Sequence, residues 1–108
     1  MAERCFGMLM LPKKYLSEEV KREIEKELGM PFAFKEGGIV EITEENGIIK
    51  ISDMKARYGM FEELEEWLRE KQIPFDRYSE SCGDAPAERY YFRPGKVDRV
   101  VPLSYCGV

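Results

Sequence analysis

The chain has 108 residues, with 17 Lys and Arg against 21 Asp and Glu, no histidine and three cysteines. This length suits a single domain, and 44% apolar with 35% charged residues is typical of a soluble globular protein rather than a disordered one. No apolar run reaches the roughly 18 residues of a membrane span, and no signal peptide is recognisable, so we expect a cytoplasmic protein. The net charge of −4 argues against direct nucleic-acid binding through charge alone.

The chain begins with a predicted strand and a predicted helix. Residues 4–11 are almost continuously apolar and stop at Pro12, which is typical of a strand buried on both faces. Ser17 is expected to cap the following helix, because its side-chain oxygen can accept a hydrogen bond from the first helical turn. Gly29 is expected to end that helix, whose apolar stripe is Val20, Ile24 and Leu28.

Residues 39–52 are predicted to form a β-hairpin. Asn46 and Gly47 are the residue types that a tight type I′ turn requires, because both central positions need a positive φ. This turn places Ile42 opposite Ile51. One face of the hairpin is then apolar and packs into the core, through Val40, Ile42, Ile49 and Ile51.

A second helix is predicted over residues 60–71, with a break at Gly59. A longer helix capped by Asp53 is less favourable, because glycine inside a helix costs roughly 1 kcal/mol. The apolar stripe of this helix is Phe61, Leu64 and Leu68. Its acidic residues are expected on solvent faces and offer an alternative contact surface: Glu62, Glu63, Glu65 and Glu66.

The remaining chain reads as strands around one loop. The expected strands are 75–78, 88–93 and a last extended piece within 97–105, and the expected loop is 79–87.

The order of elements predicts one α+β domain over residues 1–108, a ferredoxin-like βαββαβ sandwich with two helices on one sheet face and an extra C-terminal strand or extension. A different mixed α+β sheet is the alternative. We expect the second sheet face to be covered by the C-terminal segment, by a partner chain or by both.

Several kinds of functional site are disfavoured by missing motifs. No glycine-rich phosphate-binding motif occurs, and the third strand lacks the aromatic residues of RNA-recognition modules. Cys5 reads as a small core residue and Cys82 as an exposed, inert thiol, because acidic neighbours disfavour its thiolate. Three scattered cysteines without histidine make a zinc site unfavourable. We therefore expect no metal, no cofactor and no catalytic residues.

Tyrosine and arginine concentrate on two strands near the C-terminus. The candidate binding residues are Arg77, Tyr78, Arg89, Tyr91 and Arg93. Strand alternation points Arg89, Tyr91 and Arg93 one way and Glu88, Tyr90 and Phe92 the other way. Tyr and Arg are typical of interface hot spots, and Arg also suits an anionic ligand. The structural alternative is ordinary cross-strand pairing, in which Asp76 and Glu88 neutralise the arginines.

Residues 61–95 carry a faint resemblance. The segments Phe-Glu-Glu-Leu-Glu-Glu-Trp-Leu and Tyr-Tyr-Phe-Arg-Pro-Gly are similar in general style to small proteins of phages and mobile elements. The likeness covers about a third of the chain, contains no diagnostic motif and implies no activity.

The sequence thus predicts a small non-enzymatic binding or inhibitory module that acts by protein–protein contact, with homo-oligomerisation expected. The alternative is a regulator or sequestering protein for an anionic small molecule such as a nucleotide, held by Arg77, Arg89 or Arg93. An enzyme that uses Cys82 or carboxylates ranks third, because the commonest general base is absent.

Overall fold

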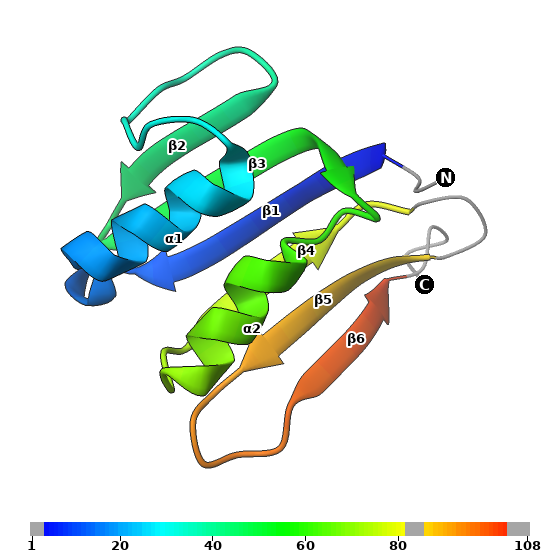
Figure 1. The fold of residues 1–108 in the computed structure, drawn as a ribbon. Coiled ribbons are helices and arrows are strands. Elements are labelled where there is room, and N and C mark those ends of the chain that lie inside the picture. Colours follow the sequence, from blue (N-terminus) through cyan, green and yellow to red (C-terminus); the bar gives the residue numbers. More distant parts are fainter. Residues whose placement is uncertain (1–3, 82–85, 104–108) are drawn as a thin grey trace.

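Six antiparallel strands and two α-helices make up the fold in the computed structural model, which describes residues 4–81 and 86–103 (Figure 1). The strands are β1 (Arg4–Pro12), β2 (Val40–Glu45), β3 (Ile48–Arg57), β4 (Phe75–Ser79), β5 (Ala87–Phe92) and β6 (Arg99–Leu103). The helices are α1 (Glu18–Leu28) and α2 (Glu62–Glu70), and a single 3₁₀ turn, η1 (Lys13–Tyr15), follows β1.

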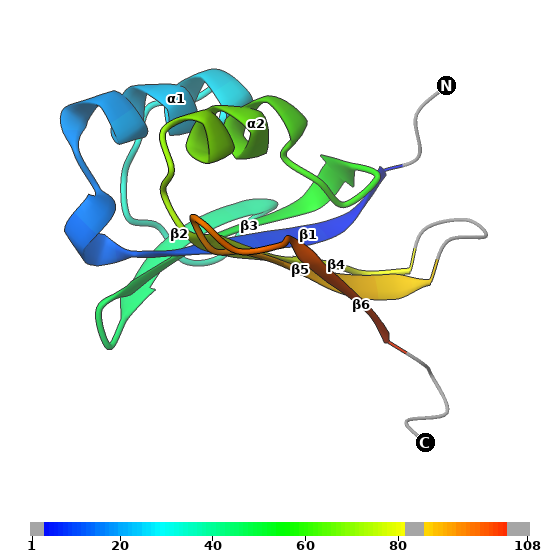
Figure 2. The same ribbon diagram turned by 90° about the horizontal axis from the view of Figure 1, so that it is seen from below.

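The strands lie in the order β2-β3-β1-β4-β5-β6, and every neighbouring pair is antiparallel. Both helices lie on the same side of this sheet (Figure 2). The predicted α+β class is therefore confirmed, and β1 and β3 pair with each other inside the sheet. The order of the strands differs from that of a four-stranded ferredoxin-like sheet, because β5 and β6 extend the sheet beyond β4.

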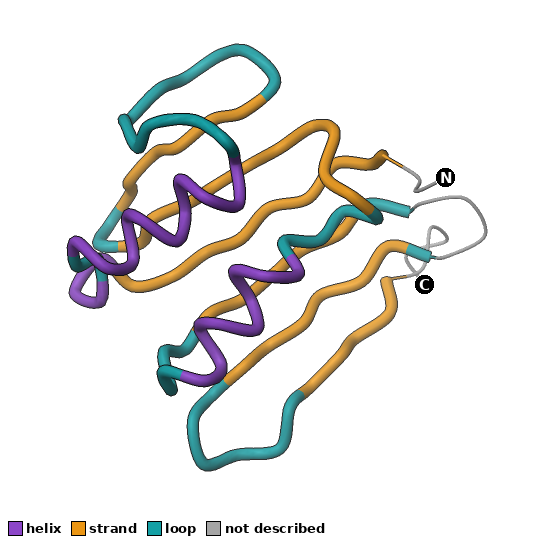
Figure 3. Tube along the Cα trace, in the orientation of Figure 1, coloured by secondary structure: helices purple, strands orange, loops and turns teal. Residues whose placement is uncertain are grey.

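Helix α1 forms where its capping residues predict it. The Ser17 hydroxyl accepts a hydrogen bond from the Val20 amide at 3.2 Å, and Gly29 ends the helix with a φ of 69°. Val20 and Ile24 are buried against the sheet. From Gly29 the chain passes through a long loop to β2 at one edge of the sheet (Figure 3).

The β2–β3 hairpin also has the predicted turn and register. Asn46 and Gly47 have φ angles of 52° and 79°, and Ile42 pairs with Ile51. Strand β3 continues beyond the predicted hairpin to Arg57, because β1 is long enough to pair along it and Arg57 lies opposite Arg4. Asp53 therefore lies within a strand and caps no helix.

Helix α2 starts after a turn at Gly59, as predicted. Gly59 has a φ of 67°, and its carbonyl oxygen accepts a hydrogen bond from the Ser79 hydroxyl at 2.8 Å. Gly7 lies directly beneath this turn, where a Cβ would collide with the Gly59 carbonyl. The loop before α2 can approach the sheet only because Gly7 has no side chain.

The hydrophobic core lies between the helices and the sheet. Leu9 at the centre of β1 is completely buried, as are Ile24 of α1 and Leu68 of α2. Cys5 on β1 is half-buried and disulfide-bonded, whereas the sequence indicates an ordinary core residue. Cys82 lies outside the described residues.

The two sheet edges differ. On the β2 side, Lys35 exchanges backbone hydrogen bonds with Ile42 at 2.8 and 3.0 Å and so occupies part of that edge. Strand β6 is the other edge of the described sheet. In the part of the chain that the structure describes, neither helix has the length and apolar character needed to cross a membrane.

Candidate functional site

The candidate residues are divided between two faces of the sheet. Phe75, Arg77 and Ser79 of β4 are buried under the helices, so the intervening Asp76 and Tyr78 point to the opposite face. Tyr78 pairs with Arg89 and Asp76 pairs with Tyr91, which places both β5 residues on that same face.

We define the open face as the sheet surface opposite α1 and α2. Two rows of side chains cross it through all six strands. One row is Glu41, Ser52, Met8, Tyr78, Arg89 and Val101, and the other is Thr43, Lys50, Met10, Asp76, Tyr91 and Arg99. Within residues 4–81 and 86–103, no helix covers this face (Figure 2).

Aromatic and arginine side chains contact one another on the open face. The rings of Phe6 and Tyr78 lie 6.2 Å apart between centroids, and the Arg89 guanidinium lies 5.8 Å from the centroid of the Tyr91 ring. The Arg89 Nε is buried and has no hydrogen-bond partner among the described residues. A buried donor without an acceptor costs free energy, so this side chain is held in place at the expense of that hydrogen bond.

Arg93 lies just beyond β5 and is tied to the start of β4. Its Nη1 lies 2.8 Å from Asp76 Oδ1, and it donates to the carbonyl oxygens of Phe75 and Phe92 at 3.3 and 2.9 Å. Asp76 Oδ1 is buried yet accepts no well-directed hydrogen bond within the described chain, so its close contact with Arg93 is an ion pair without a hydrogen bond. The predicted neutralisation by Asp76 is therefore observed for Arg93.

Charge is unevenly distributed over the open face. Among the described residues, the β4–β6 half carries the acidic side chains of Asp76 and, just beyond β4, Glu80, against three arginines, Arg89, Arg93 and Arg99. The β2 end carries Glu41 and Glu45 instead. A chain with a net charge of −4 therefore presents a locally basic, aromatic surface.

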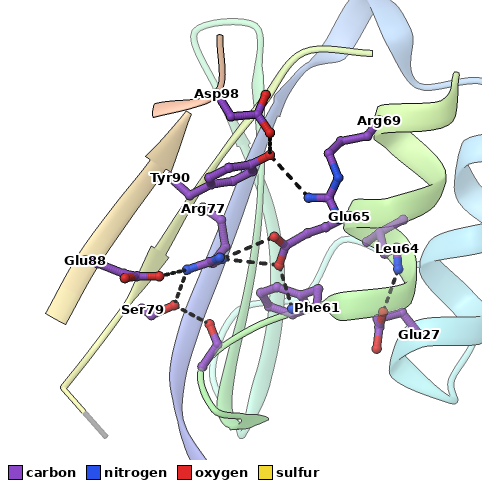
Figure 4. A network of polar contacts seen from close by, with 11 residues as sticks. Glu27, Phe61, Leu64, Glu65, Arg69, Arg77, Ser79, Glu88, Tyr90 and Asp98 are labelled. Atoms are coloured by element: carbon purple, nitrogen blue, oxygen red, sulfur yellow. Dashed lines mark hydrogen bonds and ion pairs between the residues drawn. The ribbon is translucent and has the colours of Figure 1, made fainter. Parts of the chain in front are cut away.

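Arg77 lies on the helix-covered side of the sheet, opposite the remaining candidates, and Figure 4 shows it beside Glu65 of α2. It is 5% exposed, and its Nε donates to both carboxylate oxygens of Glu65, at 3.3 and 3.2 Å. Its Nη1 donates to Ser79 Oγ at 2.7 Å and to Glu88 Oε1 at 3.0 Å. These contacts hold α2 against β4 and β5, and they leave Arg77 inaccessible to a large partner.

The prediction that Glu65 faces solvent is wrong. Glu65 is 3% exposed, and besides Arg77 it binds the Phe61 amide, which donates to Oε2 at 2.8 Å. Its position could have been predicted from helical spacing, because Glu65 follows Phe61 by four residues and precedes Leu68 by three. The other three predicted acidic residues are exposed: Glu62, Glu63 and Glu66.

Two further polar contacts join the helices to their surroundings. The Tyr90 hydroxyl donates to Asp98 at 2.6 Å and accepts from Arg69 at 3.3 Å, and burial together with the Asp98 contact raises the pKa of Tyr90. Glu27 of α1 accepts a hydrogen bond from the Leu64 amide at 2.8 Å. Burial raises the pKa of Glu27, and nearby acidic side chains add to the effect.

A cavity of about 470 Å³ lies at one end of the open face, where β1 ends and β4 begins. Its lining includes Met10 and Lys50 of the open face together with Lys14 and Arg93. Among the described residues, no group of three or more metal-binding side chains is placed to hold an ion. The lining of this cavity combines aromatic, cationic and apolar side chains, such as Phe75, Lys14 and Met10.

No known protein family, curated protein or solved structure matches this chain.

Proposed function

We propose that this chain is a small non-enzymatic binding module that contacts an acidic surface of a partner protein through the β4–β6 half of the open face. The observation that supports this proposal most is the position of Tyr78, Arg89 and Tyr91, which share a sheet face that no described helix covers.

The side-chain chemistry of the open face suits a protein interface. Tyr, Arg and Met are enriched in interfaces, and Tyr and Arg supply most hot spots, because they bury a large area and still make directional hydrogen bonds. Met8 and Met10 lie at the centre of the face, Tyr78 lies beside Met8, and Asp76 separates Met10 from Tyr91. The methionines and tyrosines therefore supply contact area, and the charged side chains of Lys50 and Asp76 flank Met10.

The charge distribution favours an acidic partner. Arg89, Arg93 and Arg99 outnumber Asp76 and Glu80 among the described residues of this half of the face. Carboxylates of a partner would pair with arginines at this surface through charge-assisted hydrogen bonds. Charges at the border of an interface mainly accelerate association, so binding should weaken as salt is added.

The test compares the two faces of the molecule. The full chain and the variants Arg89→Ala and Tyr91→Ala are used to capture proteins from cells of the source organism, with Glu62→Ala and Glu66→Ala on the exposed side of α2 as matched controls. A partner retained by the wild type and the α2 variants but lost by the open-face variants supports the proposal. Its affinity, measured with the purified partner, should fall by more than about tenfold, as for a hot spot.

A partner lost only by the α2 variants would place the interface on the acidic helix and contradict the proposal. Thermal unfolding of each variant separates lost binding from lost folding, since Arg89 and Tyr91 are half-buried.

Homo-oligomerisation belongs to the same proposal. Glu41 at the β2 end of the open face complements the basic β5–β6 end of a second copy, whereas Glu45 is already paired with Lys50. A two-fold arrangement would form both such contacts at once. Sedimentation of the wild type should show self-association that Arg89→Ala weakens, and a monomer at all concentrations would restrict the proposal to a different partner protein.

For the fold, we infer that β1 to β4 and the two helices form a ferredoxin-like unit extended by β5 and β6, because these four strands lie in the order β2-β3-β1-β4. The cytoplasmic location stays a prediction from the sequence. The disulfide bond at Cys5 argues against it, since disulfides persist mainly in oxidising compartments.

A further inference from the structure

The cavity at the end of the open face has the size and lining of a small-molecule site. Its volume of about 470 Å³ lies within the roughly 300–1,000 Å³ of typical ligand pockets. Its apolar wall comes from separate strands and turns and consists of Met10, Pro12, Ile48 and Pro74. Such a wall suits a flat or extended apolar body.

The charged side chains around this cavity leave one cation unmatched. Lys50 donates to Glu45 at 2.9 Å, which lowers the pKa of that carboxyl and keeps it ionised, and Arg93 pairs with Asp76 at 2.8 Å. Lys14 also lines the cavity, and no acidic side chain of the described chain pairs with it. Three cations against two anions give the lining a net charge of +1.

We propose that this cavity binds a small apolar monocarboxylate, with the carboxylate at Lys14 and the apolar body on the wall formed by Met10 and Ile48. A single unmatched ammonium complements a single negative charge. A nucleotide phosphate carries about two negative charges. Lys14 would neutralise only one of them, and the other would be repelled by Glu45 and Asp76. The cavity shares Met10, Asp76 and Arg93 with the proposed protein contact, but its test uses Lys14, which that contact does not include.

The test is a titration of the ¹⁵N-labelled full chain with cinnamate, followed by the chemical shifts of backbone amides. Cinnamamide serves as the matched neutral compound, because it has the same shape and no charge. Saturable shifts should concentrate at the end of β1, in η1 and at the start of β4, and cinnamate should bind at least fivefold more tightly than cinnamamide.

Two adjacent lysines provide the matched variants. Lys13 and Lys14 are both exposed on η1, but only Lys14 lines this cavity. Lys14→Gln should weaken cinnamate binding about fivefold, and Lys13→Gln should leave it unchanged within a factor of about two. Neither exposed substitution should disturb folding.

Three results would overturn the proposal. They are the absence of saturable shifts around the cavity, equal affinity for cinnamate and cinnamamide, and equal effects of Lys13→Gln and Lys14→Gln. Tighter binding of adenosine monophosphate than of cinnamate would also overturn the proposal, because the cavity would then prefer a phosphate to a carboxylate. None of these results affects the Arg89 and Tyr91 test, so failure of one proposal is distinguishable from failure of the other.

Discussion

Replacing Arg77 by methionine should remove a large part of the free energy of unfolding. The Arg77 guanidinium makes bonds of 2.7–3.3 Å to Glu65, Ser79 and Glu88, and the side chains of Arg77 and Glu65 are 6% and 4% exposed. Methionine retains most of the length but no charge, so the Glu65 carboxylate is left buried without its cation. Removing one partner of a buried ion pair costs about 3–5 kcal/mol, against a total of about 5–15 kcal/mol for a domain.

Urea unfolding at pH 7, followed by circular dichroism and by Trp67 fluorescence, measures this loss. The double variant Arg77→Met with Glu65→Gln is the internal control, because glutamine is neutral and still offers an acceptor to the Phe61 amide, which donates to Glu65 at 2.8 Å in the wild type. We expect the double variant to be more stable than Arg77→Met alone. A loss below about 1 kcal/mol in Arg77→Met, or a double variant no more stable than the single one, would refute the reasoning.

Three other substitutions test separate features. Gly7→Ala should destabilise the chain by about 1–3 kcal/mol in urea unfolding, because its Cβ would collide with the Gly59 carbonyl, and an unchanged midpoint would show that the turn can move away. Ser17→Ala should cost about 1 kcal/mol by removing the bond that the Val20 amide donates, whereas Ser17→Asp should keep the cap. The pKa of Glu27 is raised above its ordinary 4.5, so its contribution is present at low pH and is lost as the pH rises. The stability of Glu27→Gln relative to the wild type should therefore increase as the pH rises above about 4.5, and a parallel pair of pH profiles would contradict this.

The elements with strong local signals were predictable from the sequence. Ser17 and Gly29 mark the ends of α1 through their own side-chain and backbone chemistry, and Asn46 with Gly47 determines the hairpin register. The extension of β3 to Arg57 was not predictable in this way, because it depends on pairing with a strand about fifty residues earlier in the chain.

The candidate site was predictable only in part. Strand alternation correctly separates Tyr91 from Tyr90, because the period of a strand is a local property. The burial of Arg77 depends on Glu65, a residue of another element, and the acid-rich start of α2 resembles a solvated helix face. The cavity beside Lys14 brings together parts of the chain that share no sequence pattern, so only the tertiary structure identifies it.

The two edges of the sheet determine how it can associate with other chains. An unpaired strand edge can template the addition of strands from other molecules, which leads to fibrils. Lys35 already occupies backbone groups of Ile42 at one edge, and Pro102 in β6 has no backbone N–H to offer at the other. Growth by strand addition is therefore hindered at both ends of the sheet, and concentrated solutions should stay free of fibrils while association proceeds through side chains.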